Sequence, residues 1–400
     1  MSMRISGVCL SLVVSVSVAV QLIPTGAFAG CPPTPSWNVP EDEPGLVLAD
    51  GVGLMAERIA GPFEVPWAVG LLPDGSFLVT ERPGRLQHVT QAAGTYPVDG
   101  VPPVLYSGHG GLLDVEVDPN FQDNGIIYLS YLQGEETASI VKVMRAHFDA
   151  DREALTDQQV IFEGSPGARP ELLGGRIALT DDGYLFLSLG ERWDRDKAQD
   201  LSDTSGKIVR IKVDGSIPED NPFRYVPGAR PEIWSYGHRN PQGLAFDAAT
   251  RELWSDEHGP QGGDELNLIQ RGGNYGWPIA TYGVDYSGRP IAINSEQPGT
   301  ELPVRYWVPI SIAPSSLSVE TGPSSTEIWM GALAGQMVVQ LTLDGSCVLT
   351  EEHLFRNQLG RIRDVRVDDS GTLYILTDGD QGMLYRVERP PMSEDDKTHL

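Results

Sequence analysis

Short stretches of alternating apolar and polar residues recur along the chain, each interrupted by a turn rich in Asp, Gly, Pro or Asn. In the last copy Val365 and Val367 alternate with polar neighbours, residues 369–371 read Asp-Ser-Gly, and Leu373 and Ile375 resume the alternation. A period of two on both sides of such a turn predicts a half-buried β-hairpin. Five further copies share the pattern, so the sequence predicts six hairpins, at residues 67–80, 113–131, 176–189, 243–256, 316–332 and 364–377.

The spacing of the hairpins predicts how they assemble. Their first residues lie between 46 and 73 positions apart, which leaves room for four strands in each unit. Radial packing of such units buries both faces of every sheet and leaves only short edges. We therefore predict an all-β chain, a six-bladed β-propeller of four-stranded antiparallel blades over residues 56–390. A multi-domain β protein with coincidental turns is the alternative.

The amino-acid composition is typical of a chain with many tight turns, and the net charge excludes some classes of binding partner. The 400 residues include 45 glycines and 31 prolines without a Gly-X-Y period, as expected for turn-rich structure. The formal net charge of -26 repels phosphate backbones, so nucleic-acid binding is not expected.

The beginning of the chain is read as an export signal. Residues 1–29 carry one charge, at Arg4, then an apolar stretch, then Ala27-Phe28-Ala29, which is typical of a cleavage site. The run ending in Gly30-Cys31 also resembles a lipoprotein box, in which the signal is residues 1–30 and Cys31 is acylated. Either way we expect a periplasmic or secreted protein, anchored to lipid through Cys31 in the second case, and no transmembrane span, because no second long apolar run occurs.

The cysteines and the two ends leave one alternative open. Cys9 leaves with the signal, so Cys31 and Cys347 remain and would form a disulfide unless Cys31 is acylated. Residues 30–55 are predicted to be an extended lead-in, and residues 391–400 a polar tail.

Three polar, glycine-rich segments are candidates for chemistry. Residues 236–243 include Arg239 and Asn240, and a guanidinium there suits a planar or anionic ligand, unless it only pairs with a carboxylate. Residues 256–265, followed by 272–278, offer carboxylates and exposed carbonyls, the hard oxygen ligands of Ca²⁺, or else form a solvated acidic loop. In the third segment Arg361 and Arg363 share one face of a strand and indicate an anionic ligand or two surface salt bridges.

Together these segments resemble the soluble pyrroloquinoline quinone (PQQ)-dependent aldose dehydrogenases, the glucose/sorbosone dehydrogenase family. Residues 111–115 and 198–201 add to the resemblance, which runs from residue 66 to residue 386. It implies a six-bladed propeller that binds PQQ and Ca²⁺ and oxidises the C1 hydroxyl of an aldose or a related alcohol. No haem-attachment Cys-x-x-Cys-His motif is present, so electrons would leave to an external acceptor.

The resemblance also assigns roles residue by residue. Arg239 would stabilise the charge that develops on the cofactor, with Asn240 beside it. Arg361 and Arg363 would meet the cofactor's carboxylates, and Gln199 would line the pocket. The implied Ca²⁺ ligands are the backbone carbonyls of Gly259 and Pro260 at the cofactor, and Asp264, Glu265 and Tyr275 at a further site.

Two positions depart from the family. Leu172 stands where the family has its catalytic histidine, and Ala334 stands where a lysine contacts the cofactor. A hydrocarbon cannot accept a proton, and losing a general base costs roughly 10²–10⁴-fold in rate. A lost hydrogen bond from a charged group is worth roughly 1.5–3 kcal/mol.

Three residues could replace the missing base. His109 is the leading substitute because histidine titrates near neutral pH, and Glu171 and Glu191 are second choices. Glu191 matches the acidic residue that normally orients the histidine. Alternatively, His109 is only a hydrogen-bond donor, and both glutamates pair with Arg176 or Arg192. Two functions follow: an exported quinoprotein with a relocated base, or a degenerate propeller that binds a sugar, PQQ or Ca²⁺ without turnover.

Overall fold

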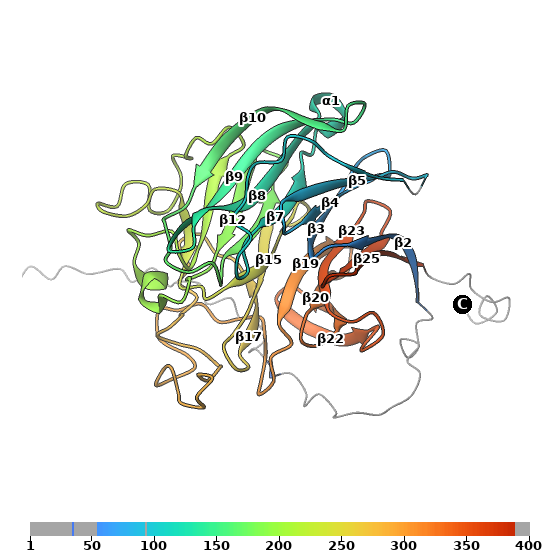
Figure 1. Ribbon diagram of the computed structural model, residues 1–400. Coiled ribbons are helices and arrows are strands. Elements are labelled where there is room, and N and C mark those ends of the chain that lie inside the picture. The colour runs from blue at the N-terminus through green and yellow to red at the C-terminus, as the bar shows by residue number, and fades with distance from the viewer. Residues whose placement is uncertain (1–33, 36–53, 93, 389–400) are drawn as a thin grey trace, which may run out of the picture. The chain divides into compact units, whose positions relative to one another are not determined.

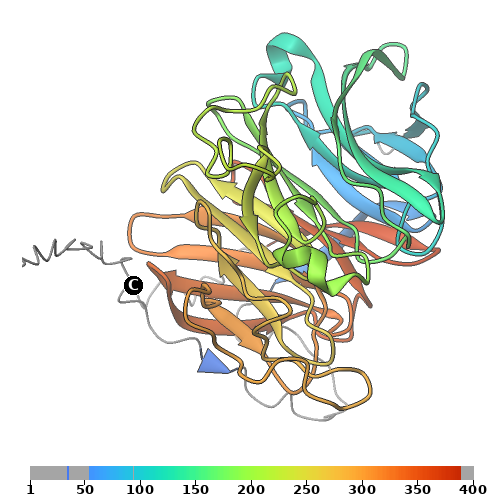
Figure 2. The same ribbon diagram turned by 90° about the vertical axis from the view of Figure 1, so that its left-hand side faces the viewer.

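The computed structural model describes residues 34–35, 54–92 and 94–388, and these form six antiparallel sheets arranged as the blades of a propeller (Figures 1 and 2). The first three blades, each from its innermost strand outward, are β3 (Pro66–Leu71), β4 (Phe77–Glu81), β5 (Arg85–Val89) and β6 (Thr95–Pro97); β7 (Leu112–Val117), β8 (Ile126–Glu135), β9 (Ala138–Asp149) and β10 (Ala154–Glu163); and β11 (Gly174–Leu179), β12 (Tyr184–Leu189), β13 (Lys207–Lys212) and β14 (Ile233–Tyr236).

The other three blades are β15 (Pro241–Asp247), β16 (Glu252–Glu257), β17 (Asp264–Leu268) and β18 (Arg305–Trp307); β19 (Pro314–Thr321), β20 (Thr326–Ala332), β21 (Met337–Asp344) and β22 (Cys347–Leu354); and β23 (Ile362–Val367), β24 (Leu373–Thr377), β25 (Gly382–Glu388) and β2 (Met55–Phe63). The short β1 (Thr34–Pro35) pairs in parallel with β18. A single-turn α1 (Phe121–Asn124) and a 3₁₀ helix at Arg195–Gln199 complete the elements.

The six predicted hairpins are confirmed, and each supplies the two inner strands of one blade. The inner strands β3, β7, β11, β15, β19 and β23 each contact the next, and β23 contacts β3, which closes the ring. Closure uses a strand from the other end of the described chain, because β2 pairs with β25 as the outer strand of the last blade. This pairing joins residues over 300 positions apart, and hairpin spacing alone does not reveal it.

The turn residues act through specific hydrogen bonds. Between β23 and β24, one carboxylate oxygen of Asp368 accepts from the backbone N–H groups of Ser370 and Thr372, at 2.9 and 3.0 Å. Gly371 in this turn has a φ of 80°, which glycine adopts without a steric cost. The Asp-x-Ser-Gly pattern therefore turns the chain by satisfying its own backbone.

Buried hydroxyl groups connect neighbouring blades. The hydroxyl of Ser188 on β12 donates to the carbonyl oxygen of Pro241 on β15, at 3.0 Å. Thr80 makes the same contact from the first blade to Leu113 in the second, at 2.6 Å. Buried aliphatic and aromatic side chains fill the space between the sheets around these bonds. The polar bonds fix the register between blades, while apolar burial supplies most of the stabilisation.

One buried guanidinium, that of Arg176, contacts all five other blades. Its Nη1 lies 3.0 and 3.1 Å from two buried carboxylates, its Nε and Nη2 each donate to a backbone carbonyl at 3.0 Å, and its Cζ lies 4.1 Å from the centre of an indole ring. These partners are Asp114, Asp364, Gln242, Ser315 and Trp67. Arg176 is thus a structural centre of the ring, and neither Glu171 nor Glu191 is its partner.

Some expectations concern residues outside this description. The export signal at 1–29 or 1–30, Cys31, most of the lead-in and the tail at 391–400 lie outside the described residues. Cys347, at the start of β22, is disulfide-bonded. Within the described part of the chain, no helix has the length and apolar character needed to cross a membrane.

Candidate functional site

The loops that carry the candidate residues emerge at one end of the ring. In every blade the loop that precedes the inner strand and the loop that follows the second strand are neighbours, because these two strands are antiparallel. His109, Arg239 and Arg361 precede inner strands, whereas Glu191 and His258 follow second strands. The fold therefore brings to one mouth residues that the sequence scatters over about 250 positions.

Two arginines at this mouth have no carboxylate partner among the residues that the structure describes. The buried guanidinium of Arg239 donates from Nη1 to the carbonyl oxygens of His258 and Gly259, at 3.0 and 2.7 Å. That of Arg82 donates to the carbonyl oxygen of Gly110, at 3.2 Å from Nε and 3.0 Å from Nη2. Unpaired cations held by carbonyl groups form a preorganised anion site, in a chain that is otherwise strongly acidic.

The predicted pair of arginines shares one carboxylate. Arg361 Nε lies 2.9 Å from Asp378 Oδ2, and Arg363 Nη2 lies 3.2 Å from Asp378 Oδ1. The Arg361 side chain is half exposed, whereas Arg363 is buried. Because Asp378 neutralises one of the two charges, the pair offers about one net positive charge to a ligand.

His109 lies among these cations. Its Nδ1 accepts a hydrogen bond from the backbone N–H of Leu172, at 3.2 Å. The residue is exposed at the mouth, but desolvation of its imidazole by the surrounding loops, and then the guanidiniums of Arg82, Arg363 and Arg239, lower the pKa of His109 to about 4. His109 is therefore neutral at pH 7 and carries its proton on Nε2, so it presents a donor to the mouth.

Glu191 is buried without a hydrogen-bond partner for either carboxylate oxygen within the described residues. Burial raises the pKa of Glu191 to about 7, although Arg239 and Arg195 act in the opposite direction. Its backbone N–H donates to the carbonyl oxygen of Arg239, at 2.9 Å. A carboxylate with unused acceptors and a pKa near neutrality has the properties of a general base. The alternative that Glu191 pairs with Arg176 or Arg192 is not realised.

A second imidazole, His258, supports Asn240 at the mouth. Its Nε2 donates to the carbonyl oxygen of Pro314 at 2.7 Å, and its Nδ1 lies 3.4 Å from Asn240 Nδ2. Burial lowers the pKa of His258 to about 3, with Arg239 adding to the effect. Asn240 Oδ1 also accepts from the backbone N–H of Gly174, at 3.2 Å. Both side chains are thus held in place by neighbouring blades.

The expected side-chain ligands of a further Ca²⁺ site are already engaged. Asp264 accepts from the N–H groups of Gly259 and Ala313, both at 2.8 Å, and from a serine hydroxyl at 2.6 Å. The Tyr275 hydroxyl donates to one backbone carbonyl and accepts from one backbone N–H, both at 2.7 Å. Burial and the neighbouring charge of Glu257 raise the pKa of Glu265 well above its usual range. The described residues contain no cluster of three or more His, Cys, Asp or Glu side chains suited to a metal. A Ca²⁺ site at Asp264, Glu265 and Tyr275 stays a prediction.

The carbonyl ligands predicted at Gly259 and Pro260 face a different difficulty. The Gly259 carbonyl oxygen accepts from the Arg239 guanidinium, so a cation bound there would stand beside another cation. An anionic cofactor lying between them would remove that repulsion. Ca²⁺ at Gly259 and Pro260 therefore stays a prediction that depends on such a cofactor.

Gln199 connects its own loop, which follows β12, to the loop that follows β17. Its amide nitrogen donates to Asn274 Oδ1 at 2.9 Å and to the carbonyl oxygen of Trp277 at 2.8 Å, and its amide oxygen accepts from Asn274 at 2.9 Å. Contact of Gln199 with a cofactor remains a prediction.

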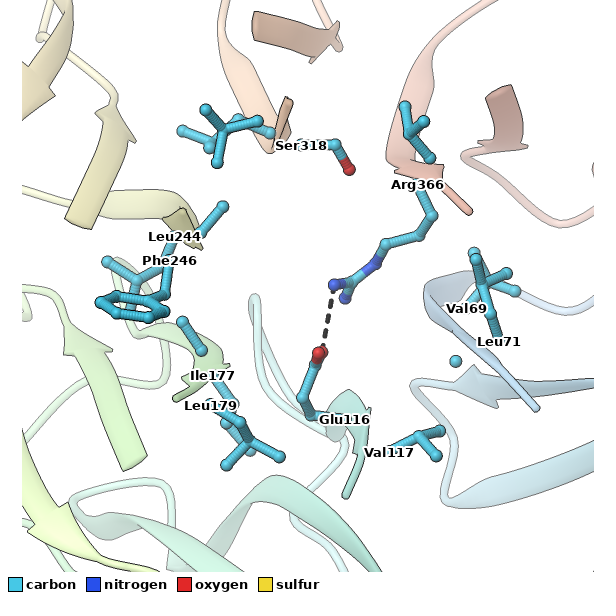
Figure 3. Close-up of a pocket in the computed structure, with 16 residues that line it drawn as sticks. Val69, Leu71, Glu116, Val117, Ile177, Leu179, Leu244, Phe246, Ser318 and Arg366 are labelled. Atoms are coloured by element: carbon cyan, nitrogen blue, oxygen red, sulfur yellow. Dashed lines mark hydrogen bonds and ion pairs between the residues drawn. The ribbon is translucent and has the colours of Figure 1, made fainter. Parts of the chain in front are cut away.

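A cavity of about 280 Å³, whose lining residues are drawn in Figure 3, lies where the inner strands end, at the opposite end of the ring. Apolar side chains from all six inner strands line it, and the charged pair inside it joins Arg366 Nη1 to Glu116 Oε2 at 3.0 Å. Arg366 also contacts Asp114 and Asp364, so its charge is fully compensated. The charged pair in this cavity is compensated, whereas the guanidiniums without a carboxylate partner within the described residues lie at the other mouth, and we place the candidate site there.

Several residues of this mouth were missed by reasoning from the sequence. Arg82, Asp378 and His258 all follow the second strand of a blade, as Glu191 does. Because the hairpin pattern predicts where each second strand ends, it could have identified these residues as candidates.

With this geometry established, comparison with known proteins places the chain. The family model described as glucose / sorbosone dehydrogenase matches residues 63–386, and the chain belongs to this family of β-propellers. It is 41% identical over 341 residues to the aldose sugar dehydrogenase YliI of Escherichia coli K12, covering 83% of this chain and 92% of that protein.

Solved structures agree with this assignment. The crystal structure of the soluble aldose sugar dehydrogenase of E. coli in its apo-form matches with a TM-score of 0.78 and 39% identity, over 84% of this chain and 99% of that one. The PQQ-bound form of an aldose sugar dehydrogenase from Streptomyces coelicolor matches with a TM-score of 0.70 and 28% identity, over 84% and 97% of the two chains.

Proposed function

We propose that this protein is an exported quinoprotein that oxidises an aldose, or a related alcohol, at a carbon bearing a hydroxyl group. The relatives named above are aldose sugar dehydrogenases, one of them in a PQQ-bound form, which supports sugar oxidation as the reaction class. We place the protein in the periplasm or outside the cell, on the sequence signal alone, with an external electron acceptor as its partner.

The observation that carries the proposal is the excess of guanidinium groups at one mouth. Arg82 and Arg239 lack carboxylate partners within the described residues, and Arg361 and Arg363 share one. A neutral sugar does not require this charge, whereas PQQ, a planar tricarboxylate, does. The residues present therefore fit the cofactor, and Arg239, Arg361 and Arg363 would hold it.

Each side chain then has a defined task. PQQ, when bound, would supply the acceptor for the hydride that leaves the sugar carbon. We assign the hydroxyl proton to the buried carboxylate of Glu191, because both of its oxygens lack a hydrogen-bond partner within the described residues and its pKa lies near neutrality. His109 donates from Nε2 and orients an oxygen acceptor, and Arg239 stabilises developing negative charge. This assignment replaces His109, the leading candidate from sequence, because its Nδ1 is occupied and its basicity is low.

Reconstitution tests the proposal. The purified mature chain is mixed with PQQ, with and without Ca²⁺, and dye reduction is followed over a panel of aldoses and alcohols. We expect turnover that falls at least roughly 100-fold in Glu191→Gln, the lower range for loss of a general base. The matched control is Glu171→Gln, on the neighbouring loop. PQQ binding without turnover of any substrate would defeat the proposal, and full activity of Glu191→Gln would remove Glu191 from it.

A second candidate function rests on Leu172 and Ala334. Leu172 is buried where the family has its histidine, and Ala334 places no charge at the mouth. These substitutions favour a degenerate propeller that binds a sugar, PQQ or Ca²⁺ without turnover. Leu172→His discriminates between the two, because it creates activity in a degenerate protein and adds little to an enzyme that already has a base.

A further inference from the structure

An exposed tryptophan stands in an unfavourable backbone conformation beside the mouth. Arg192 and Trp193 are consecutive, and both have left-handed φ angles, of 60° and 63°. For residues other than glycine this conformation costs roughly 1–2 kcal/mol each. The Trp193 side chain is only partly buried in return, since it remains 39% exposed. Strain that displays a large apolar side chain to solvent indicates a functional role for that side chain.

The Arg192 side chain holds this turn in place. Its buried guanidinium donates to the carbonyl oxygen of Arg169 at 2.6 Å, and to the hydroxyl of Ser139 at 2.7 Å. These bonds anchor the turn to the preceding blade. The conformation of Trp193 is therefore set by its neighbour, and the indole itself is free to contact a ligand.

A second exposed aromatic residue lies next to Trp193. The rings of Trp193 and Tyr286 have centroids 6.4 Å apart and are inclined by 51°. Tyr286 is 62% exposed, and its loop is tied to the loop of Trp193 by the ion pair between Arg195 and Asp285, at 2.7 Å. The two rings thus form an open aromatic wall with a fixed relative position.

The aromatic wall adjoins the unpaired guanidinium of the site. Arg239 Cζ lies 6.0 Å from the centre of the Trp193 ring, and Nη2 lies 3.5 Å from the Tyr286 hydroxyl. Exposure rises from Arg239, at 4%, to Trp193 and Tyr286. The wall therefore borders Arg239 and is more open to solvent than the guanidinium itself.

We propose that Trp193 and Tyr286 form the surface on which the sugar ring stacks. This proposal rests on the proposed function for its substrate class, a neutral pyranose. The C–H groups on one face of a pyranose ring are apolar and pack against aromatic rings, while its hydroxyl groups find donors and acceptors in the Tyr286 hydroxyl and Arg239. Two isolated exposed aromatics would need no explanation, but a tethered pair beside an unpaired cation does.

Binding is measured by calorimetry on the mature chain, with and without PQQ, using D-glucose and the disaccharide cellobiose. Glycerol, which has hydroxyl groups but no ring face, is the control ligand. We expect Trp193→Gly and Tyr286→Ala each to weaken binding of both sugars at least fivefold. Trp193→Gly should leave the melting temperature unchanged or higher, because glycine adopts a positive φ freely. Tyr225→Ala, at a 76% exposed tyrosine in the loop between β13 and β14, should bind normally.

The outcomes separate this inference from the proposed function. If the protein shows no turnover but binds sugar, and both variants weaken that binding, the aromatic wall is supported and the dehydrogenase proposal is defeated. In a protein with turnover, KM should rise in both variants while kcat changes less than about threefold. The inference is overturned if both variants bind sugar like the wild type, or if the wild type binds neither sugar in either form. Tyr286→Ala decides the matter should Trp193→Gly fold poorly.

Discussion

The backbone N–H of Leu172 donates to Nδ1 of His109 at 3.2 Å, across the boundary between the second and third blades. Leu172, which the family resemblance predicts to stand in place of the histidine, thereby fixes the tautomer of His109. With Nδ1 occupied and three guanidiniums nearby, His109 presents Nε2–H to the mouth and stays neutral. His109 is suited to donate a hydrogen bond and unsuited to take a proton.

This relationship predicts unequal effects of two substitutions at His109. Glutamine can accept from Leu172 through its carbonyl oxygen and donate through its amide, so His109→Gln should keep kcat/KM within about threefold. His109→Ala should lower kcat/KM more than tenfold, because a hydrogen bond to a charged group is worth roughly 1.5–3 kcal/mol and alanine cannot donate one. Dye-coupled rates from pH 5 to 8 provide the measurement. If glutamine is as damaging as alanine, His109 acts as a base.

Glu191 should make the stability of the fold depend on pH. Its pKa is raised in the folded protein, to about 7 from 4.5, so the protonated form is favoured by folding and stability is lost as pH rises through 7. Glu191→Gln removes this loss, and we expect its free energy of unfolding to exceed the wild-type value by up to about 3 kcal/mol at pH 8. The difference should vanish below pH 4.5.

Urea unfolding of the protein without cofactor, at pH 4.5, 6 and 8, measures this dependence. Glu219→Gln, at an exposed turn, is the control and should show no such trend. If the free energies of unfolding of Glu191→Gln and the wild type differ by the same amount at all three pH values, the folded protein does not hold Glu191 in its protonated form.

A positive charge restored at position 334 should strengthen cofactor binding. Ala334 is exposed at the mouth, and the carbonyl oxygen of the preceding Leu333 lies 3.4 Å from Arg361 Nη1. A lysine there can reach an anionic ligand, so we expect Ala334→Lys to lower the Kd for PQQ about tenfold. Ala334→Glu should raise it. Fluorescence titration at low and high salt gives both values, and equal affinities in the two variants would place position 334 away from the cofactor.

Arg176 should be among the most sensitive positions for stability. Arg176→Met leaves the buried carboxylates of Asp114 and Asp364 without this partner, and breaking a buried pair in this way costs about 3–5 kcal/mol. We expect a fall of that size in the free energy of unfolding. Arg152→Met, at an exposed arginine, should change it by less than about 0.5 kcal/mol. A loss below 1 kcal/mol for Arg176→Met would show that the ring does not depend on this centre.

Local sequence patterns were sufficient to predict much of the fold and part of the candidate site. The alternation around Val365 and the Asp-Ser-Gly turn at 369–371 are local, so the hairpins could be predicted without tertiary information, and their number gave the six blades. Arg239 and Asn240 were found because a polar, glycine-rich run before a strand exceeds what a turn needs. Asp378 was missed because it follows β24, whereas its partners lie at the start of β23, Arg361 just before the strand and Arg363 within it, so the pairing depends on strand register.

By itself the sequence determined the β-hairpins and their sixfold recurrence, because both depend on residues close together in the chain. The replacement of a histidine by Leu172 stays a prediction from the family resemblance. Only the tertiary structure decided which cations lack partners, which nitrogen of His109 is occupied, and that Trp193 stands beside Tyr286. These properties depend on distances between residues from different blades. Such distances, and the desolvation that shifts the pKa of Glu191, arise only when the ring closes.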